Sequence, residues 1–176
     1  CPTTCVCQAE GVVSCVGRQL EGVPTNIPPD TRTLDLGNTG ISRIPGLAFS
    51  QVPGLEVLRM EDNKLESDTV AMFGGLTGLE FLDLSDLGLR VLEPGAFENL
   101  AVLDTLVLSD NSGIYNLDTD VFRGLQSLRT LRMTDCGLRT VDRRLLSDMP
   151  ALSSVVLNGN PLECSADLCS LIRWLH

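Results

Sequence analysis

The sequence is poor in the side chains that most enzymes and metal sites require. It contains a single histidine, His176, together with five Phe, one Tyr and one Trp in 176 residues. A catalytic triad or a histidine metal site therefore has almost nothing to be built from. Hydrophobic residues still make up 43% of the chain, so Leu, Val and Ile must fill the core. The length suits one domain and is too short for two ordinary ones.

Basic residues are scarce as well. Thirteen Lys and Arg stand against 23 Asp and Glu, which gives a formal net charge of -10. A surface this negative repels phosphate backbones and anionic lipids, which argues against nucleic acid and membrane surfaces as partners. The longest uncharged stretch, residues 149–162, is broken by two prolines and is shorter than the roughly 20 apolar residues of a membrane helix. We therefore expect no direct membrane insertion.

The cysteines gather at the two ends of the chain. They are Cys1, Cys5, Cys7 and Cys15 near the start, Cys164 and Cys169 near the end, and Cys136 by itself. Zinc sites favour paired C-x(2–4)-C knuckles set well apart, and this spacing does not match them. Disulfides are the preferred interpretation, although the sequence alone permits three pairings of the first four cysteines. The chain also opens on Cys1 without a leader, which predicts a secreted product whose signal peptide has been removed.

A repeat of 24 residues organises the middle of the chain. The units are 31–54, 55–78, 79–102, 103–127 and 128–151, followed by a partial unit from residue 152. Each fits the pattern L-x-x-L-x-L-x-x-N/C-x-L, and the fourth unit carries one extra residue near Ser112 and Gly113. A Phe returns eighteen residues after the unit start at Phe49, Phe73 and Phe97, and one residue later at Phe122.

This periodicity predicts a stack of short strands. Apolar residues at the fourth and sixth positions give each strand one buried face, which only a neighbouring unit can cover. The ninth position should hold an Asn that bonds the backbone of adjacent turns, as at Asn63, Asn111 and Asn160. Thr39 and Leu87 break that series, and Cys136 replaces it as a small, buried, free thiol.

The period, the spacing and the number of copies resemble extracellular leucine-rich-repeat proteins, and the plan is most similar to variable lymphocyte receptors. The resemblance implies an α/β-type solenoid: a curved right-handed stack with a parallel sheet on its concave face, an irregular or 3-10 convex side, and disulfide-bonded caps. It implies one domain over residues 1–176, with an N-terminal cap (1–30), five repeats (31–151) and a short C-terminal cap (152–176). The family pairing joins Cys1 to Cys7 and Cys5 to Cys15, and we interpret Cys164 and Cys169 as a third disulfide.

The outward positions of the concave face are the second, third, fifth, seventh and eighth of each unit. They hold ten acids, Asp35, Glu56, Glu61, Asp62, Glu80, Asp83, Asp86, Asp104, Asp110 and Asp135, and four bases, Arg32, Arg59, Arg129 and Arg132. The middle three units alone carry eight acids and one base. Four of the Asp residues share the eighth position and form a column of like charge. Recognition is one interpretation of this charge, and Asp capping of local turns on a solvated face is the other.

The resemblance implies a non-catalytic recognition protein of variable-lymphocyte-receptor type, either secreted or the ectodomain of a surface-anchored protein. Its ligand would be an antigen or a bacterial or other cell-surface molecule of cationic character. The ligand-binding residues we expect are Arg59, Glu61, Asp62, Phe81, Asp83, Asp86, Asp104, Asp110 and Asp135. An adhesion, guidance or matrix module with a dedicated protein partner is the alternative. We expect no enzyme activity, because such faces are open and shallow, and no metal or cofactor.

Overall fold

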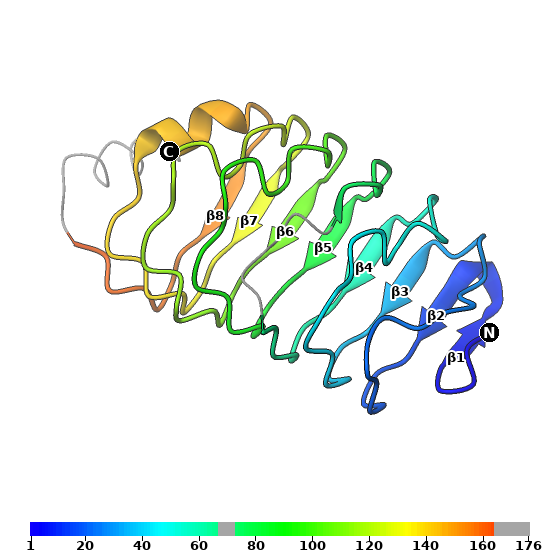
Figure 1. Ribbon diagram of the computed structural model, residues 1–176. Helices are drawn as coiled ribbons and strands as arrows, with labels where there is room; N and C mark the ends of the chain where they lie inside the picture. The colour runs from blue at the N-terminus through cyan, green and yellow to red at the C-terminus, as the bar shows by residue number, and fades with distance from the viewer. Residues whose placement is uncertain (67–72, 164–176) are drawn as a thin grey trace.

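The chain forms a coil of short strands joined by turns. A computed structural model describes residues 1–66 and 73–163. Its strands are β1 (Val6–Gln8), β2 (Val12–Ser14), β3 (Thr33–Asp35), β4 (Val57–Arg59), β5 (Phe81–Asp83), β6 (Thr105–Val107), β7 (Thr130–Arg132) and β8 (Ser154–Val156). They make one sheet in chain order, which Figure 1 shows running from the N-terminal end to the C-terminal end. The predicted parallel-strand solenoid is confirmed.

The strand register matches the repeat register residue for residue. Leu34, Leu58, Leu82 and Leu106 are paired in one row across β3 to β6, and all are buried. The row continues to Leu131 in β7, so the extra residue of the fourth unit leaves the pairing intact. That residue is taken up in a turn closed by the Ile114 N–H, which donates to the Asn111 carbonyl at 2.9 Å.

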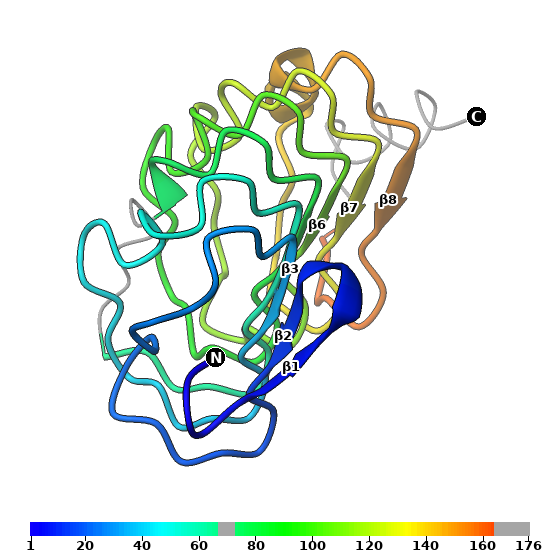
Figure 2. The same ribbon diagram turned by 90° about the vertical axis from the view of Figure 1, so that its right-hand side faces the viewer.

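The return path of each unit lies on the other side of the core from the sheet, as Figure 2 shows. In the described residues it consists of turns and of the 3-10 helix η3 (Arg143–Asp148), while a further 3-10 turn, η1 (Ala9–Gly11), connects β1 to β2 in the N-terminal cap. The Phe residues of the repeat enter the core from this side and are buried. An irregular, 3-10 convex side was the expectation, and the described residues agree with it.

The N-terminal cap extends the sheet and closes its first edge. β1 and β2 form an antiparallel hairpin, and β2 then pairs in parallel with β3, so Val13 and Cys15 are buried against the first repeat. Disulfides join Cys1 to Cys7 and Cys5 to Cys15, as the family pairing implied. The predicted bond between Cys164 and Cys169 lies outside the described residues.

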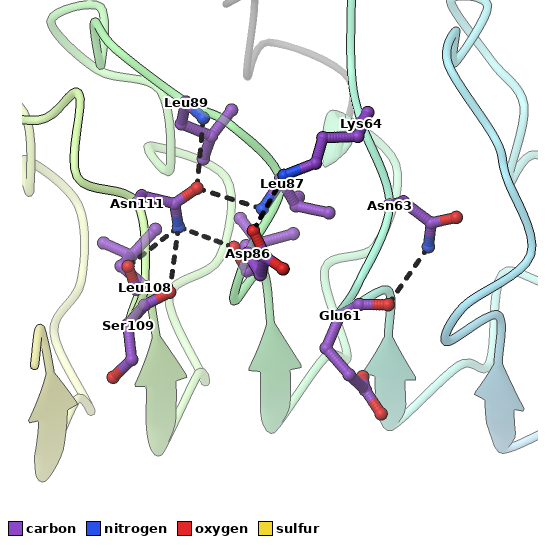
Figure 3. A network of polar contacts seen from close by, with 10 residues as sticks. Glu61, Asn63, Lys64, Asp86, Leu87, Leu89, Leu108, Ser109 and Asn111 are labelled. Carbon is purple, nitrogen blue, oxygen red and sulfur yellow. Dashed lines mark hydrogen bonds and ion pairs between the residues drawn. The ribbon is translucent and has the colours of Figure 1, made fainter. Parts of the chain in front are cut away.

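The asparagines at the ninth position tie the units together in pairs. Asn111 is fully buried, and its amide donates to the carbonyls of Leu108 in its own unit and Leu84 in the preceding one, at 2.8 and 2.9 Å (Figure 3). Its Oδ1 accepts the N–H groups of Leu87 and Leu89 in the preceding unit, at 3.1 and 3.0 Å. One side chain thus satisfies four backbone groups that the bend leaves without partners.

Asn63 and Asn160 make the same bonds one pair of units earlier and later. Asn63 reaches back to Leu36, and Asn160 reaches back to Met133. The bridges therefore join units 1 with 2, 3 with 4 and 5 with 6. Phenylalanine stacking has the same pairing, because Phe49 lies against Phe73 and Phe97 against Phe122, each at 6.2 Å between ring centroids.

The remaining joints are closed by other means. Between units 2 and 3, where Leu87 replaces Asn, the Leu65 N–H donates to the Leu87 carbonyl at 3.1 Å. Between units 4 and 5 the Cys136 thiol donates to the Leu108 carbonyl at 3.2 Å. Cys136 is free and buried, as predicted, and burial raises the pKa of its thiol to about 11. It acts as a weak substitute for the asparagine amide.

We expect Asn111→Ala to lower the free energy of unfolding by about 3 kcal/mol or more, because several buried backbone groups lose their partner at once. Asn116→Ala, at an exposed position, should change it by less than about 0.5 kcal/mol. Urea denaturation of both variants measures the difference. Equal, small effects would mean that the buried amide does not hold the units together.

Leu47 combines two unfavourable features. Its φ is 67°, in the left-handed region that disfavours side chains, and its side chain is 80% exposed. The equivalent position of the third unit holds Gly95, with φ 71°. The turn therefore demands a left-handed residue, and Leu47 meets that demand at a cost.

We expect Leu47→Gly to stabilise the protein by about 0.5 to 1 kcal/mol, since relief of the backbone strain exceeds the entropy cost of a glycine. Leu47→Ala keeps a Cβ in the same conformation and should change little. Thermal unfolding of the two variants tests this, and a destabilised Leu47→Gly would show that the exposed side chain makes a stabilising contact.

Candidate functional site

The outward side chains of the sheet form rows that cross the strands. The fifth-position row runs Asp35, Arg59, Asp83, Val107, Arg132, each residue paired with the next in the strand register. Neighbours in such a row lie roughly 5 Å apart at the backbone. The sign of the charge therefore alternates across β3, β4 and β5, which a count of acids in the sequence does not reveal.

The column of aspartates at the eighth position has a backbone cause. Asp62, Asp86, Asp110 and Asp135 have φ between 46° and 61°, and Asn38 and Gly159 occupy the same position with φ 51° and 74°. Asp, Asn and Gly are the residues that best tolerate this left-handed conformation. The turn itself therefore favours Asp here, and the repetition of Asp does not by itself indicate a ligand.

The carboxylates that cap turns are those at the fifth position, whereas the alternative interpretation assigned this role to the eighth-position aspartates. Asp83 Oδ1 accepts the Ser85 backbone N–H at 3.0 Å and the Ser85 hydroxyl at 2.6 Å. Asp35 Oδ1 accepts the Gly37 N–H at 3.1 Å. These fifth-position carboxylates thus order the bend that follows the strand, in addition to any role they have on the surface.

Ion pairs neutralise part of the predicted acidic surface. Glu56 pairs with Arg32, Asp104 pairs with Arg129 at 3.5 Å, and Asp86 pairs with Lys64 at 3.0 Å (Figure 3). Lys64 stands at the tenth position of its unit, outside the rows counted as concave, so the sequence estimate missed it. All three pairs are exposed, and each is therefore worth little to stability.

Glu61 differs from the other acids of this surface in the burial of its carboxylate. Its side chain lies against the backbone of Gly37, where a Cβ would be 2.9 Å from Oε1. Its Oε2 is buried and has no hydrogen-bond partner. Burial, followed by the nearby charges of Asp83 and Asp35, raises the pKa of the Glu61 carboxyl. A partner that brought a positive charge would relieve this unfavourable placement.

Arg59 and Phe81 lie side by side between the acids. The Arg59 guanidinium stacks over the Phe81 ring at 5.0 Å from its centroid, and both side chains are half-buried. The pair combines an apolar face with a fixed cation, which is a common composition of binding surfaces. Phe81 is therefore an outward aromatic residue, as predicted, and it is held in place by Arg59.

Two hollows flank Phe81 on the sheet. One, of about 410 Å³, includes Val57, Val102 and Asp104. The other, of about 600 Å³, includes Asp83, Val107, Ser109 and Arg132. Phe81 and Thr105 line both hollows, so the two adjoin and are together called the groove.

The structure brings together only some of the predicted ligand residues. Arg59 on β4 is paired with Asp83 on β5 and stacks on Phe81, and Glu61 follows the end of β4 close to Asp83. Asp110 and Asp104 border the groove. Asp62, Asp86 and Asp135 follow the ends of their strands, in the row set by backbone conformation.

The sequence argument missed the floor of the groove, which is made of small residues. These are Thr105, Val107 and Ser109 of the fourth unit, next to Thr130 and Arg132 of the fifth. The sequence does contain a sign of this floor, because the fourth unit has small side chains at its third, fifth and seventh positions together. Arg132 entered the sequence argument only as one of the four bases on the concave face.

Neither metal ligation nor membrane spanning is supported by the described residues. Within residues 1–66 and 73–163, no group of three or more His, Cys, Asp and Glu residues is placed to hold a metal ion. In the same part of the chain, no helix has the length and apolar character needed to cross a membrane.

Comparison with known proteins agrees with the repeat geometry. The leucine-rich-repeat family model matches residues 29–89, 86–138 and 102–162. The chain belongs to the leucine-rich-repeat family. Leucine-rich-repeat domains are generally non-enzymatic modules that bind protein ligands, and the open groove fits that class of function.

Several leucine-rich-repeat relatives are similar over part of their length. Leucine-rich repeat-containing protein 3 of Danio rerio is 35% identical over 104 residues, which cover 57% of this chain and 39% of that protein. Leucine-rich repeat-containing protein 52 of Mus musculus is 33% identical over 165 residues, covering 66% and 52%. Leucine-rich repeat-containing G-protein coupled receptor 5A of Xenopus laevis is 38% identical over 93 residues, covering 51% and 10%. The chain thus spans about half or less of these proteins.

One solved structure has a similar fold. The crystal structure of the TLR13–ssRNA13 complex matches with a TM-score of 0.71 and 28% identity. The match covers 76% of this chain and 19% of that one.

We expect Glu61→Gln to raise the melting temperature near neutral pH. The pKa of Glu61 is higher in the folded state than in the unfolded state. Folding therefore becomes less favourable as the pH rises from the unfolded-state pKa through the folded-state pKa and the carboxyl ionises. Gln imitates the protonated form, so its advantage should fade toward about pH 4, where wild-type Glu61 is itself protonated. Thermal melts at both pH values, with Glu93→Gln as the exposed control, measure this. An advantage that grows on acidification would contradict the burial argument.

Proposed function

We propose that this leucine-rich-repeat domain is a non-catalytic recognition module of variable-lymphocyte-receptor type, which binds a cationic antigen or microbial-surface molecule on its concave sheet. The observation that carries the proposal is Glu61, a partly buried carboxylate with an unpartnered oxygen beside Asp83 and Asp35. Such an arrangement costs free energy in the unbound protein, and a bound cation would recover it.

The neighbouring side chains support a binding surface at this place. Phe81 offers an apolar contact area, and Arg59 holds its ring face, so little side-chain freedom is lost on binding. The groove beside Phe81 gives a partner room to enter the surface. Aromatic and arginine residues near the centre of an interface commonly carry much of its affinity.

Two features favour an extracellular location for this module. The cap holds two disulfides, which persist in oxidising compartments. One relative is named as a G-protein coupled receptor, and the solved neighbour is named TLR13. We therefore place the domain outside the cell, in a secreted protein or in the ectodomain of an anchored one.

A nucleic-acid ligand is disfavoured for this chain. The solved TLR13 structure is a complex of that protein with a single-stranded RNA. Here the net charge is -10, and the acids that remain without an ion pair on the concave sheet, such as Glu61 and Asp83, would repel a phosphate backbone. A module for adhesion or for the extracellular matrix remains the alternative, with one dedicated protein as its partner.

We expect the double variant Glu61→Gln with Asp83→Asn to weaken binding to the target at least about tenfold, or 1.4 kcal/mol. Asn at position 83 keeps an oxygen that can accept from Ser85, so the bend should survive. The probes are a panel of intact bacteria and yeast and an array of host secreted and ectodomain proteins. Binding to the first set indicates the immune role, and binding to one member of the second indicates the adhesion role.

The matched control for this test is Glu93→Gln with Asp120→Asn, two exposed carboxylates on adjacent turns of the return path. It removes the same number of charges and should leave affinity unchanged. Binding at increasing salt should weaken if charge is responsible. Loss of binding in the control pair but not in the concave pair would sink the proposal.

A further inference from the structure

We propose that the groove over β6 receives one extended polypeptide segment of the partner, lying along the strand. This inference rests on the proposed function and adds the shape and the chemistry of what the surface takes. It is carried by the placement of three small residues of unit 4 between the larger side chains of Phe81 and Asp83 on one side and Arg132 on the other.

The floor of the groove belongs to a single unit. Thr105, Val107 and Ser109 are the third, fifth and seventh residues of unit 4, and all three point to the outer face of the sheet. Val107 and Ser109 are only 9% and 8% exposed, and the Ser109 hydroxyl oxygen accepts the Thr134 N–H at 3.2 Å. The low floor makes a channel that follows the strand direction.

The walls are the adjacent units. On one side stand Phe81 and Asp83 of β5, and on the other Thr130 and Arg132 of β7. Because the two hollows share Phe81 and Thr105, the channel continues from Val102 at the start of the strand to Thr134 at its end. Unit 4 from residue 104 to residue 110 spans about 20 Å, the length of roughly six residues of extended chain.

The walls carry opposite charges. Asp83 stands on the β5 wall and Asp110 at the exit, while Arg132 stands on the β7 wall and forms no ion pair within the described part of the chain. A ligand that fits both walls must present a basic group toward β5 and an acidic group toward β7. Polypeptides combine such groups with apolar side chains for Phe81, Val57 and Val102, and a neutral glycan does not.

Selection from a random dodecapeptide phage library on the immobilised protein tests the inference. Enriched peptides should contain at least one Lys or Arg and one Asp or Glu. Their affinity, measured with synthetic peptides, should fall at least tenfold on Thr105→Trp and on Thr130→Trp, which fill the groove. Thr33→Trp, the same residue type in the same row but on β3, should change affinity less than twofold.

Two further measurements keep the test decisive if a filled variant folds poorly. Peptide titration into the isotopically labelled wild-type protein should shift the amide signals of Thr105, Val107 and Ser109 and leave that of Thr33 in place. Selection repeated on Arg132→Glu should lose its enrichment of Asp and Glu. Shifts confined to other strands, or an unchanged enrichment, overturn the inference.

Failure of this inference can be told apart from failure of the proposed function. If the Glu61→Gln, Asp83→Asn variant loses its target while the filled variants keep it, the acidic surface binds and the groove does not. If no peptide is enriched, or if chitohexaose or maltohexaose binds the wild-type protein and is lost on the filled variants, the polypeptide ligand is wrong. If neither set of variants affects the target, both proposals fall.

Discussion

The structure depends on the need to satisfy backbone groups at the bend that follows each strand. The chain turns there inside the core, where an unpaired N–H or carbonyl is costly. Asn111 satisfies four such groups with one side chain, and most of them belong to the preceding unit. The same contact therefore shapes the turn and fastens two units. Because only alternate units carry the asparagine, its side-chain bonds tie the units in three pairs. Strand pairing continues across the joints between the pairs, which also have a backbone bond at Leu65 and a thiol bond at Cys136.

This framework leaves the outer face of the sheet free to vary. The buried fourth-position row and the bends hold each strand in register, so a change at a third or seventh position alters the surface without moving the strand. The groove lies where the small residues of unit 4 are flanked by Phe81 and Asp83 of unit 3 and by Arg132 of unit 5. Its floor and its Phe81 wall belong to one asparagine-tied pair, and its other wall belongs to the next. The groove thus crosses the joint between two pairs, where β6 pairs with β7 and the Cys136 thiol donates to the Leu108 carbonyl.

The acids of this surface occur for several different structural reasons, which a count of acids does not distinguish. The eighth-position aspartates follow a left-handed backbone, Asp35 and Asp83 order the bends, and Glu56, Asp86 and Asp104 have basic neighbours. Glu61 has none of these accounts, and its Oε2 is buried without a hydrogen-bond partner. A functional assignment is therefore stronger for this one carboxylate than for the whole acidic set.

The sequence by itself determined the repeat, the strand positions, the place of the extra residue at Ser112 and Gly113, and the free, buried Cys136. These follow from apolar periodicity and from local turn chemistry, which are written along the chain. The family resemblance supplied the two cap disulfides. Only the tertiary structure decided that Lys64 neutralises Asp86, that Arg59 covers Phe81, and that Glu61 lies unpartnered over Gly37. Each of these contacts joins residues 22 to 24 positions apart, and its geometry depends on side-chain direction between stacked units, which periodicity does not encode.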